Sequence, residues 1–447
     1  MVTAPVLVFL YDRTFVAGGF RKAWTARRTF YLGLSATWTG LAYLLATMGA
    51  TRGGSAGFSH GVEWWPYVCS QCEAVVHYLR LGLWPSPLVF DYGQGLTASL
   101  RAIWPQALGL AALLGGTVYS LIRRNPFGFV SAAFFILISP SSSVVPIITQ
   151  TWAEHRMYLP LACEITVVVL CFHAAVGRST ACVVLAAIAV GFSLLTFRRN
   201  CDYQTARAIW ADTAAKRPNN PRARLGLGDA LFEEGQLDAA VNQFCEALRL
   251  EPNLARAHAS LGVGLLAQGN PKDALIQCRR AVELVPGNAS MRANLGDILR
   301  KTGNFSEAIA QYEIAVQLSP DDAFAHAQLA TALMQSGQIQ EAIPHFETAL
   351  RIDPDLTEAR CNFATALLRT NRVEEAIVQY RCVLRSTPGD ADVHFLLGSA
   401  LAVVGRRTDA IEQYKIALRF EPKHADARRE LERLQEVTNS TSASISK

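Results

Sequence analysis

Residues 289–322 read ASMRANLGDILRKTGNFSEAIAQYEIAVQLSPDD, and this 34-residue pattern recurs along the C-terminal half of the chain. Its most regular mark is a proline near the end of each unit. Seven prolines follow one another at intervals of 34 residues: Pro218, Pro252, Pro286, Pro320, Pro354, Pro388 and Pro422. A fixed period of this kind is typical of repeat proteins, in which each unit buries its apolar face against its neighbours. The repeat therefore predicts the fold of this half.

Each unit predicts two packed helices, and the proline ends the second because it cannot continue a helix. With the proline at position 32, position 8 is small in all six full units, among them Gly228, Gly262, Gly296 and Gly398. Position 20 is alanine throughout: Ala240, Ala274, Ala308, Ala342, Ala376 and Ala410. Small residues there let the two helices approach closely, and large residues such as Phe244 and Tyr312 at position 24 fill the space between them. A helix–turn–helix unit of this length is the tetratricopeptide repeat.

The repeat register also divides the C-terminal half into segments. Residues 201–220 match the second helix of a repeat, residues 221–422 hold six full repeats, and residues 423–437 predict a charged capping helix. Residues 438–447, TNSTSASISK, are polar and of low complexity, so we expect a disordered tail. The prediction for the whole is all-α: a polytopic transmembrane helix bundle followed by a right-handed superhelical solenoid.

The N-terminal 200 residues predict membrane spans. Five windows approach the length of about 20 apolar residues that a bilayer requires: 30–48, 103–122, 127–147, 158–176 and 180–197. Residues 2–11, VTAPVLVFLY, are apolar but half as long, and we interpret them as the end of a span that began earlier in a longer reading frame. The chain is thus expected to be an integral membrane protein with about five spans and one partial span.

Basic residues set the expected orientation of these spans. Residues 1–200 hold 14 Lys and Arg against 6 Asp and Glu, whereas residues 201–447 hold 28 against 31. Loops rich in Lys and Arg mark the cytoplasmic side. Counting onward from the basic 12–29 loop places the repeats on the extracytoplasmic side, in a periplasm or an endoplasmic reticulum lumen. No basic stripe is interleaved with aromatic residues, so we expect no nucleic-acid partner.

Three groups in this half could carry chemistry. Glu154, His155 and Arg156 lie in a short outer loop, where they could bind a phosphate or assist proton transfer, or only cap a helix at the interface. Glu164 lies inside the fourth window and is a minor candidate. Cys69 and Cys72 have ligand-like spacing without a second pair, so packing or a local disulfide is favoured over a metal or redox site. We expect no metal and no cofactor.

The repeats offer a candidate peptide groove. Position 6 is polar in four consecutive units, at Ser260, Asn294, Gln328 and Asn362, and asparagine at this position often holds an extended peptide backbone in peptide-binding arrays. The alternative is an ordinary solvated helix surface. If the groove interpretation holds, the partner is a protein or an extended peptide.

The whole chain resembles the transmembrane and tetratricopeptide repeat-containing proteins, which are polytopic glycosyltransferases that use lipid-phosphate-linked sugars. The resemblance is carried by Tyr11-Asp12-Arg13, by LRLGLWPSPLVFDYG at 79–93, by AEHRMYLPLA at 153–162, and by the direct passage into repeats. It implies that Glu154, His155 and Arg156 lie on the active-site side, near the phosphate of a polyprenyl-phosphate sugar. The catalytic acidic residue of the family lies in a loop before the first residue here, so the catalytic residue is unknown.

Two functions remain open from the sequence. The first is a membrane-anchored scaffold that mediates protein–protein interaction through its repeats, with membrane lipids as further partners. The second is the C-terminal portion of a protein O-glycosyltransferase whose repeats present the acceptor. The first requires only what this chain contains, and we favour it.

Overall fold

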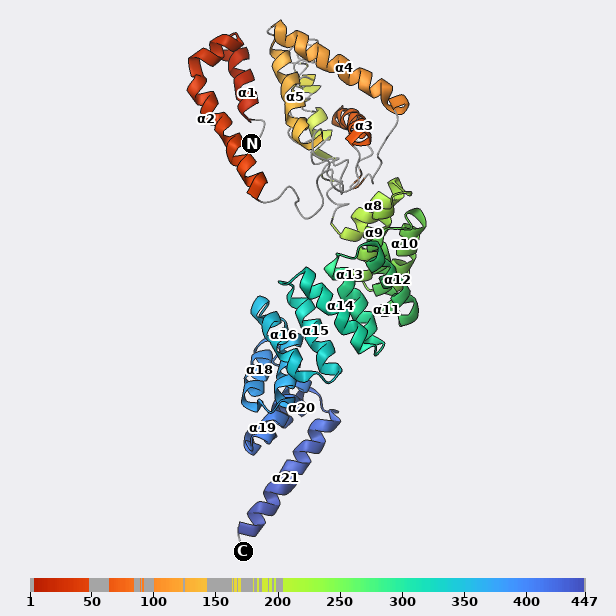
Figure 1. Ribbon diagram of the computed structural model, residues 1–447, viewed down its shortest axis with the longest axis vertical. Helices are drawn as coiled ribbons and strands as arrows, with labels where there is room; N and C mark the ends of the chain where they lie inside the picture. Colours follow the sequence, from red (N-terminus) through yellow and green to blue (C-terminus); the bar gives the residue numbers. More distant parts are fainter. Residues whose placement is uncertain are drawn as a thin grey trace. The chain divides into compact units, whose positions relative to one another are not determined.

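The structure, a computed structural model, describes residues 4–47, 64–83, 89, 91, 100–123, 125–142 and 204–445, with scattered residues between 163 and 197. Every regular element in this part of the chain is a helix, which confirms the all-α prediction. The chain divides into two compact units, Met1–Pro252 and Asn253–Lys447, and the boundary falls between the first and second full repeats. Figure 1 shows the helices of each unit.

The first unit begins with helices from the predicted membrane region. They are α1 Ala4–Tyr11, the π-helix η1 Asp12–Val16, α2 Phe20–Thr47, α3 Trp64–Leu83, α4 Leu100–Ile122 and α5 Pro126–Ser142. Among the described residues, one helical segment, Ile103–Ile122 of α4, is long and apolar enough to cross a membrane. The apolar segment Pro126–Ile138 of α5 is shorter.

The other predicted spans are described only in part. The window 30–48 falls largely in α2, which carries four basic residues within its first nine positions and has non-helical backbone angles at Arg27. The window 158–176 lies mostly outside the described residues, and the window 180–197 is described only in part. A polytopic bundle therefore stays a prediction.

Helix α3 packs against α5. One side of it is buried, with Ala74 and Tyr78 packed against Phe134 and Ile138 of α5. The buried side of α3 therefore faces apolar side chains of α5.

The helix that precedes the first repeat packs against it. Helix α8, Ala206–Lys216, begins at Thr205, whose side chain accepts a hydrogen bond from the backbone of Ala208. Its Trp210 lies against Gly226 of α9, where an added Cβ would come within 2.4 Å of the indole ring. Gly226 occupies position 6 of the first repeat, so the indole fills the place of a polar groove residue there.

A segment between α3 and α4 is joined to the first repeat. Asn220 caps α9, and its side-chain amide donates to the backbone oxygen of Asp91 at 2.9 Å. The carboxylate of Asp91 pairs with Arg222 at 3.1 Å, and Asp91 is buried. Two neighbouring residues of the repeat therefore hold one residue of the preceding region.

Each repeat consists of a first helix, here the A helix, and a second, the B helix. The A helices are α9 Pro221–Glu233, α11 Ala255–Ala267, α13 Ala289–Lys301, α15 Ala323–Gln335, α17 Thr357–Arg369 and α19 Ala391–Val403. The B helices are α10 Leu237–Leu250, α12 Pro271–Leu284, α14 Phe305–Leu318, α16 Ile339–Ile352, α18 Val373–Ser386 and α20 Arg407–Phe420. In the second unit, α11 to α21 stack in chain order (Figure 1).

The repeat positions pack as their sizes predict. The six alanines at position 20 are completely buried. A Cβ added to Gly296 would lie 2.8 Å from the ring of Tyr312, and one added to Gly398 would lie 2.6 Å from the ring of Tyr414. In these two repeats the aromatic residue at position 24 lies directly on the glycine at position 8 and leaves no room for a larger side chain.

The turn between the A and B helices needs a left-handed backbone. Gly303 has φ +82° there, and the equivalent residue of the fifth repeat, Asn371, has φ +62°. Asparagine is one of the few residues besides glycine that adopts this region readily.

The C-terminal helix is longer than the sequence indicates. Helix α21 runs from Ala425 to Ile445, whereas the capping helix was expected to end near 437 and to be followed by a disordered tail. No glycine or proline occurs between 425 and 445, so nothing in the chain interrupts the helical backbone.

Candidate functional site

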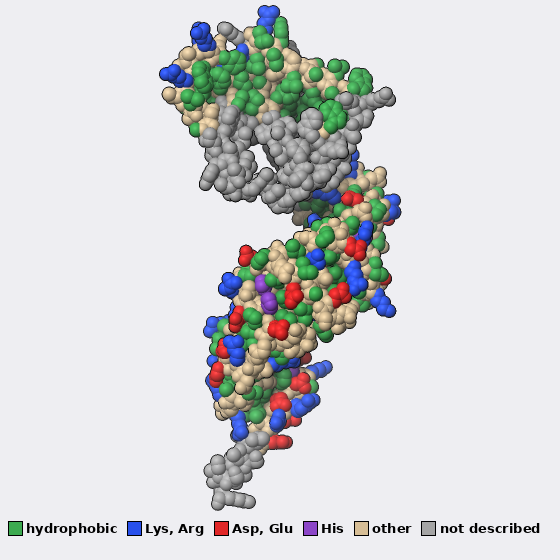
Figure 2. Space-filling model, viewed as in Figure 1, with side chains coloured by type: hydrophobic (Ala, Val, Ile, Leu, Met, Phe, Trp, Pro, Cys, Tyr) green, Lys and Arg blue, Asp and Glu red, His purple; other side chains and the backbone are tan. Residues whose placement is uncertain are grey.

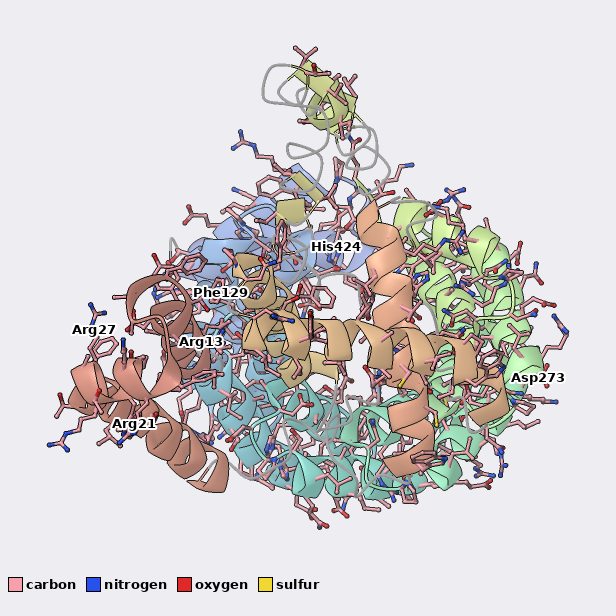
Figure 3. The ribbon with its side chains drawn as sticks, turned by 90° about the horizontal axis from the view of Figure 1, so that it is seen from above. Arg13, Arg21, Arg27, Phe129, Asp273 and His424 are labelled. Carbon is pink, nitrogen blue, oxygen red and sulfur yellow. The ribbon has the colours of Figure 1, made fainter. Side chains whose placement is uncertain are left out.

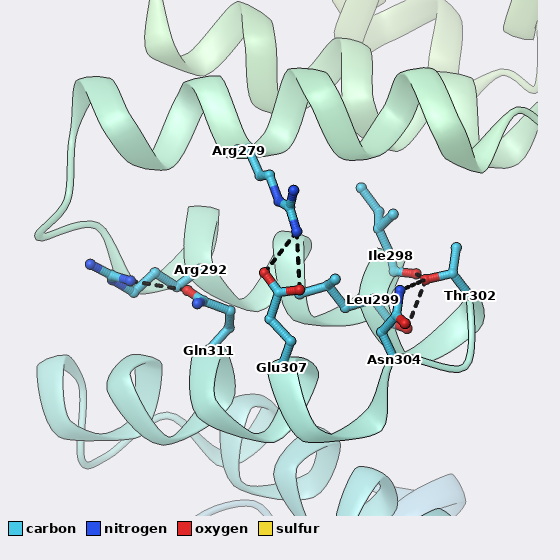
Figure 4. A network of polar contacts seen from close by, with 8 residues as sticks. All are labelled: Arg279, Arg292, Ile298, Leu299, Thr302, Asn304, Glu307 and Gln311. Atoms are coloured by element: carbon cyan, nitrogen blue, oxygen red, sulfur yellow. Dashed lines mark hydrogen bonds and ion pairs between the residues drawn. The ribbon is translucent and has the colours of Figure 1, made fainter.

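The A helices of the second unit form the inner side of the stack. Backbone contacts join α11 to α13, α13 to α15, α15 to α17 and α17 to α19. Neighbouring B helices approach one another less closely, and long side chains bridge them, as Arg279 of α12 does to Glu307 of α14 at 2.9 Å (Figure 4). A stack that is tighter on the A side curves toward it, so its concave face is built from A helices.

One stripe of each A helix faces this concave side. Positions 2, 6, 9 and 13 fall on one helix face because residues three and four apart are neighbours. In α13 these are Ser290, Asn294, Asp297 and Lys301. Positions 2 and 13 are exposed in all five A helices of the second unit, whereas positions 6 and 9 are half-buried or buried. The stripe thus has a floor, positions 6 and 9, between two exposed rims.

The floor contains the four residues predicted as a peptide groove. Ser260, Asn294, Gln328 and Asn362 are all half-buried on consecutive A helices. Asn362 donates to the hydroxyl of Thr331 at 3.4 Å, which links the fifth repeat to position 9 of the fourth. The side chains of Asn294 and Gln328 make no hydrogen bond to any described residue. Their amides can therefore serve a ligand.

Position 9 adds mostly uncharged groups to the floor. Thr331, Thr365 and Ser399 supply hydroxyls in the fourth to sixth repeats. The third repeat has Asp297, which accepts a 2.6 Å hydrogen bond from the hydroxyl of Tyr312. Burial raises the pKa of Asp297, and the bond from Tyr312 and the nearby Arg300 oppose that rise. Asp297 is the only carboxylate at positions 6 and 9 of the second unit, and Tyr312 and Arg300 already contact it.

A second ladder, which the sequence analysis missed, lies at position 4. Arginine and histidine alternate there along the chain: Arg224, His258, Arg292, His326, Arg360, His394 and Arg428. Arg292 bonds to Gln311 of its own B helix at 3.0 Å (Figure 4), and to the backbone oxygen of Pro286 at 2.8 Å. Arg360 and His394 make the equivalent pair of contacts. From the third repeat to the sixth, position 4 therefore joins the A helix to the turn before it.

The fourth repeat differs in the partner that its B helix offers to position 4. Its position 23 is His345 where the other five have glutamine, and Nδ1 of His326 lies 3.2 Å from Nδ1 of His345. Nε2 of His326 lies 3.2 Å from the oxygen of Pro320, which can only accept, so this nitrogen carries a proton. A neutral His326 then accepts at Nδ1, and His345 donates.

Most candidate residues of the membrane half are not among the residues that the structure describes. Glu154, His155, Arg156 and Glu164 lie outside the described residues. Cys69 and Cys72 are free thiols, so the structure shows no disulfide between them.

The described part of that half has a charged node in η1. Asp12 is buried, accepts a 2.6 Å bond from the hydroxyl of Tyr31, and pairs with Arg27 at 3.2 Å. The neighbouring Arg13 bonds to the backbone oxygen of Leu121. Figure 3 shows Arg13 and Arg27 on these N-terminal helices. These contacts tie η1 to α2 and α4, so the Tyr11-Asp12-Arg13 motif has a structural role here.

Comparisons with known proteins concern the repeats. Three models of the tetratricopeptide repeat match residues 228–269, 293–357 and 333–400. No curated protein matches the chain. Solved structures with similarity include YrrB, a TPR protein with an unusual peptide-binding site, at 24% identity with a TM-score of 0.38 over 42% of this chain and 96% of that one.

Two further structures are similar over comparable lengths. The Pseudomonas aeruginosa pilF protein is 23% identical, with a TM-score of 0.43 over 47% of this chain and 95% of its own. A chain of the APC/C hetero-tetramer Cut9-Hcn1 is 19% identical, with a TM-score of 0.46 over 51% and 45%. The family models and the helix pairs agree, and the C-terminal half of this chain is therefore an all-α tetratricopeptide-repeat solenoid, a fold suited to protein–protein interaction.

Proposed function

We propose that this chain is a membrane-anchored scaffold whose repeats hold extended segments of client proteins on the extracytoplasmic side. The observation that carries the binding part is the groove floor of amides and hydroxyls. An extended backbone offers one donor and one acceptor per residue, and an amide side chain can satisfy both. The uncommitted amides of Asn294 and Gln328 are the best placed to do so.

The proposed anchor rests on α4. Its apolar segment carries no charge, and large side chains such as Trp104, Leu108 and Ile122 are more than 60% exposed. Hydrophobic side chains cover much of the described N-terminal helices in Figure 2. Proteins rarely expose a contiguous apolar surface of this kind to water, because the contact is unfavourable. Lipid would cover it.

A cross-linking experiment tests the groove. A benzophenone amino acid at Phe324, an exposed rim position, should cross-link to a client in cells, whereas the same group at Glu313 on the outer B helix should not. Asn294→Ala with Asn362→Ala should weaken the cross-link from 324. Equal cross-linking from both sites, or no effect of the floor variants, would refute the groove.

Extraction and protease protection test the anchor and its side. Membranes washed at alkaline pH should retain the chain, and protease added from the extracytoplasmic side should remove the repeats. Release of the chain by the wash would refute the membrane anchor. Digestion of the repeats only by protease added from the cytoplasmic side would show the opposite orientation. In the same membranes, sugar transfer from a polyprenyl-phosphate donor that Glu154→Gln abolishes would favour the glycosyltransferase alternative.

A further inference from the structure

The two rims of the groove differ in charge. At position 2, the exposed residues from the second to the sixth repeat are Arg256, Ser290, Phe324, Glu358 and Asp392. At position 13 they are Ala267, Lys301, Gln335, Arg369 and Val403, with no acidic side chain. The first rim therefore changes from basic through aromatic to acidic along the array, beside a floor that is almost uncharged.

The middle of this rim is apolar. Phe324 is 52% exposed at the start of α15, next to Gln328 on the same stripe. An aromatic ring at the edge of a binding surface is a common anchor for an apolar side chain of a partner.

The end of the rim is negative. Glu358 makes no ion pair with any described residue, and Asp392 has only His424, whose Nε2 lies 3.3 Å from its carboxylate. The pKa of Cys361 is raised to about 11, first by burial and then by the negative charges of Asp390, Asp392 and Glu358, so all three carboxylates lie near this thiol.

The basic group closest in sequence does not cancel this charge locally. Arg360 is committed to Gln379 at 2.9 Å and to the oxygen of Pro354. Arg369 belongs to the opposite rim. A partner with positive charge at this end would therefore meet complementary charge.

We propose that the groove takes an extended segment with an apolar side chain over Phe324 and Lys or Arg side chains over Glu358 and Asp392. This proposal rests on the proposed function of the groove and adds the chemistry of its client. Neighbouring helices pack about 10 Å apart, which corresponds to about three residues of extended chain. The basic residues should therefore stand at about the third and sixth positions from the apolar one, in either chain direction.

Synthetic peptides test this spacing against the full chain in detergent micelles. The probe is a fluorescent peptide of about twelve residues, built from Ser, Thr and Gly, with one Leu and with Arg at the third and sixth positions from it; both directions are made. A comparison peptide carries Gln in place of Arg. Fluorescence anisotropy at low salt should show the Arg peptide binding more tightly in one direction, and salt should weaken it.

Charge-neutral variants locate the effect. Glu358→Gln with Asp392→Asn should weaken the Arg peptide about five- to tenfold and leave the Gln peptide unchanged, as expected for two exposed ion pairs. Glu313→Gln with Glu412→Gln is the matched control, because it removes two exposed acids from B helices. Phe324→Ala should weaken the Arg and Gln peptides alike, because both carry Leu.

The outcomes distinguish a failure of the proposed client chemistry from a failure of the groove itself. Equal binding of the Arg and Gln peptides, or no binding of either, overturns the proposed client chemistry, as does an equal loss in the control variant. If Asn294→Ala with Asn362→Ala weakens both peptides while the rim variant does not, the groove stands and the charge rule fails. If neither set of variants matters, the groove fails too.

Discussion

Replacing His345 by glutamine should make the fourth repeat insensitive to mild acid. Glutamine occupies this position in the other five repeats, so the variant restores a partner that the array already uses. The imidazole pair can hold one added proton with its contact intact, since the protonated ring donates and the other accepts. A second proton places two N–H groups face to face across 3.2 Å.

The size of the effect follows from the geometry. The ring centroids of His326 and His345 are 5.4 Å apart, so two unit charges would repel by about 3 kcal/mol at an effective dielectric constant of about 20, and by about 0.8 kcal/mol in water. His345 is half-buried, so we expect about 1–2 kcal/mol.

The sign follows from the direction of the shift. Burial, and then the charge of His326, lower the pKa of His345 below its usual 6.5. Between the lowered pKa and 6.5 the unfolded chain binds more protons than the folded chain. The stability of the fourth repeat is therefore fully present above pH 6.5 and is lost as the pH falls below it.

Hydrogen exchange of the full chain measures this locally. Protection of α15 and α16, corrected for the intrinsic rate, should fall by about 1 kcal/mol between pH 7.5 and pH 5.5 in the wild type and stay nearly constant in His345→Gln. His258→Arg is the control, because it removes a histidine that faces Gln277, an amide. The same loss of protection in His345→Gln and wild type would refute the reasoning.

Two other substitutions test the packing. Gly398→Ala should cost about 1–3 kcal/mol in thermal or denaturant unfolding, because its Cβ would lie 2.6 Å from the ring of Tyr414; Gly389→Ala, whose Cβ would meet its nearest neighbour at 3.5 Å, should cost far less, and equal costs would contradict the contact. Asn220→Ala should lower the protection of α9 more than Asn288→Ala lowers that of α13, since both lose a helix cap of about 1 kcal/mol and only Asn220 also loses its bond to the segment before α4. Equal losses would mean that this bond adds nothing to stability.

Sequence reasoning was most successful where contacts are local and repeated. The contact between Gly296 and Tyr312 spans 16 residues and recurs in the first and sixth repeats, so residue size at two positions predicts it. Its largest miss was position 4, where arginine and histidine look like unrelated surface residues. They act alike because both carry N–H groups that reach the same proline oxygen, and only coordinates show that oxygen within reach.

In the membrane half, most of what the sequence predicts stays a prediction. Apolar windows and basic loops predict spans, and the described residues contain one helical segment that meets the criterion, Ile103–Ile122. The remaining spans, the orientation, and the roles of Glu154, His155 and Arg156 stay predictions.

The amino-acid sequence by itself determined the helix pairs of the repeats, because a fixed period places the same small and large residues against each other within each unit. Only the tertiary structure decided which groups meet between distant parts of the chain. Asp91 is bonded to Asn220 across 129 residues, and the acidic rim gathers Glu358 and Asp392 from neighbouring repeats. Such contacts depend on how elements stack and turn, which no local pattern of residue size or polarity specifies.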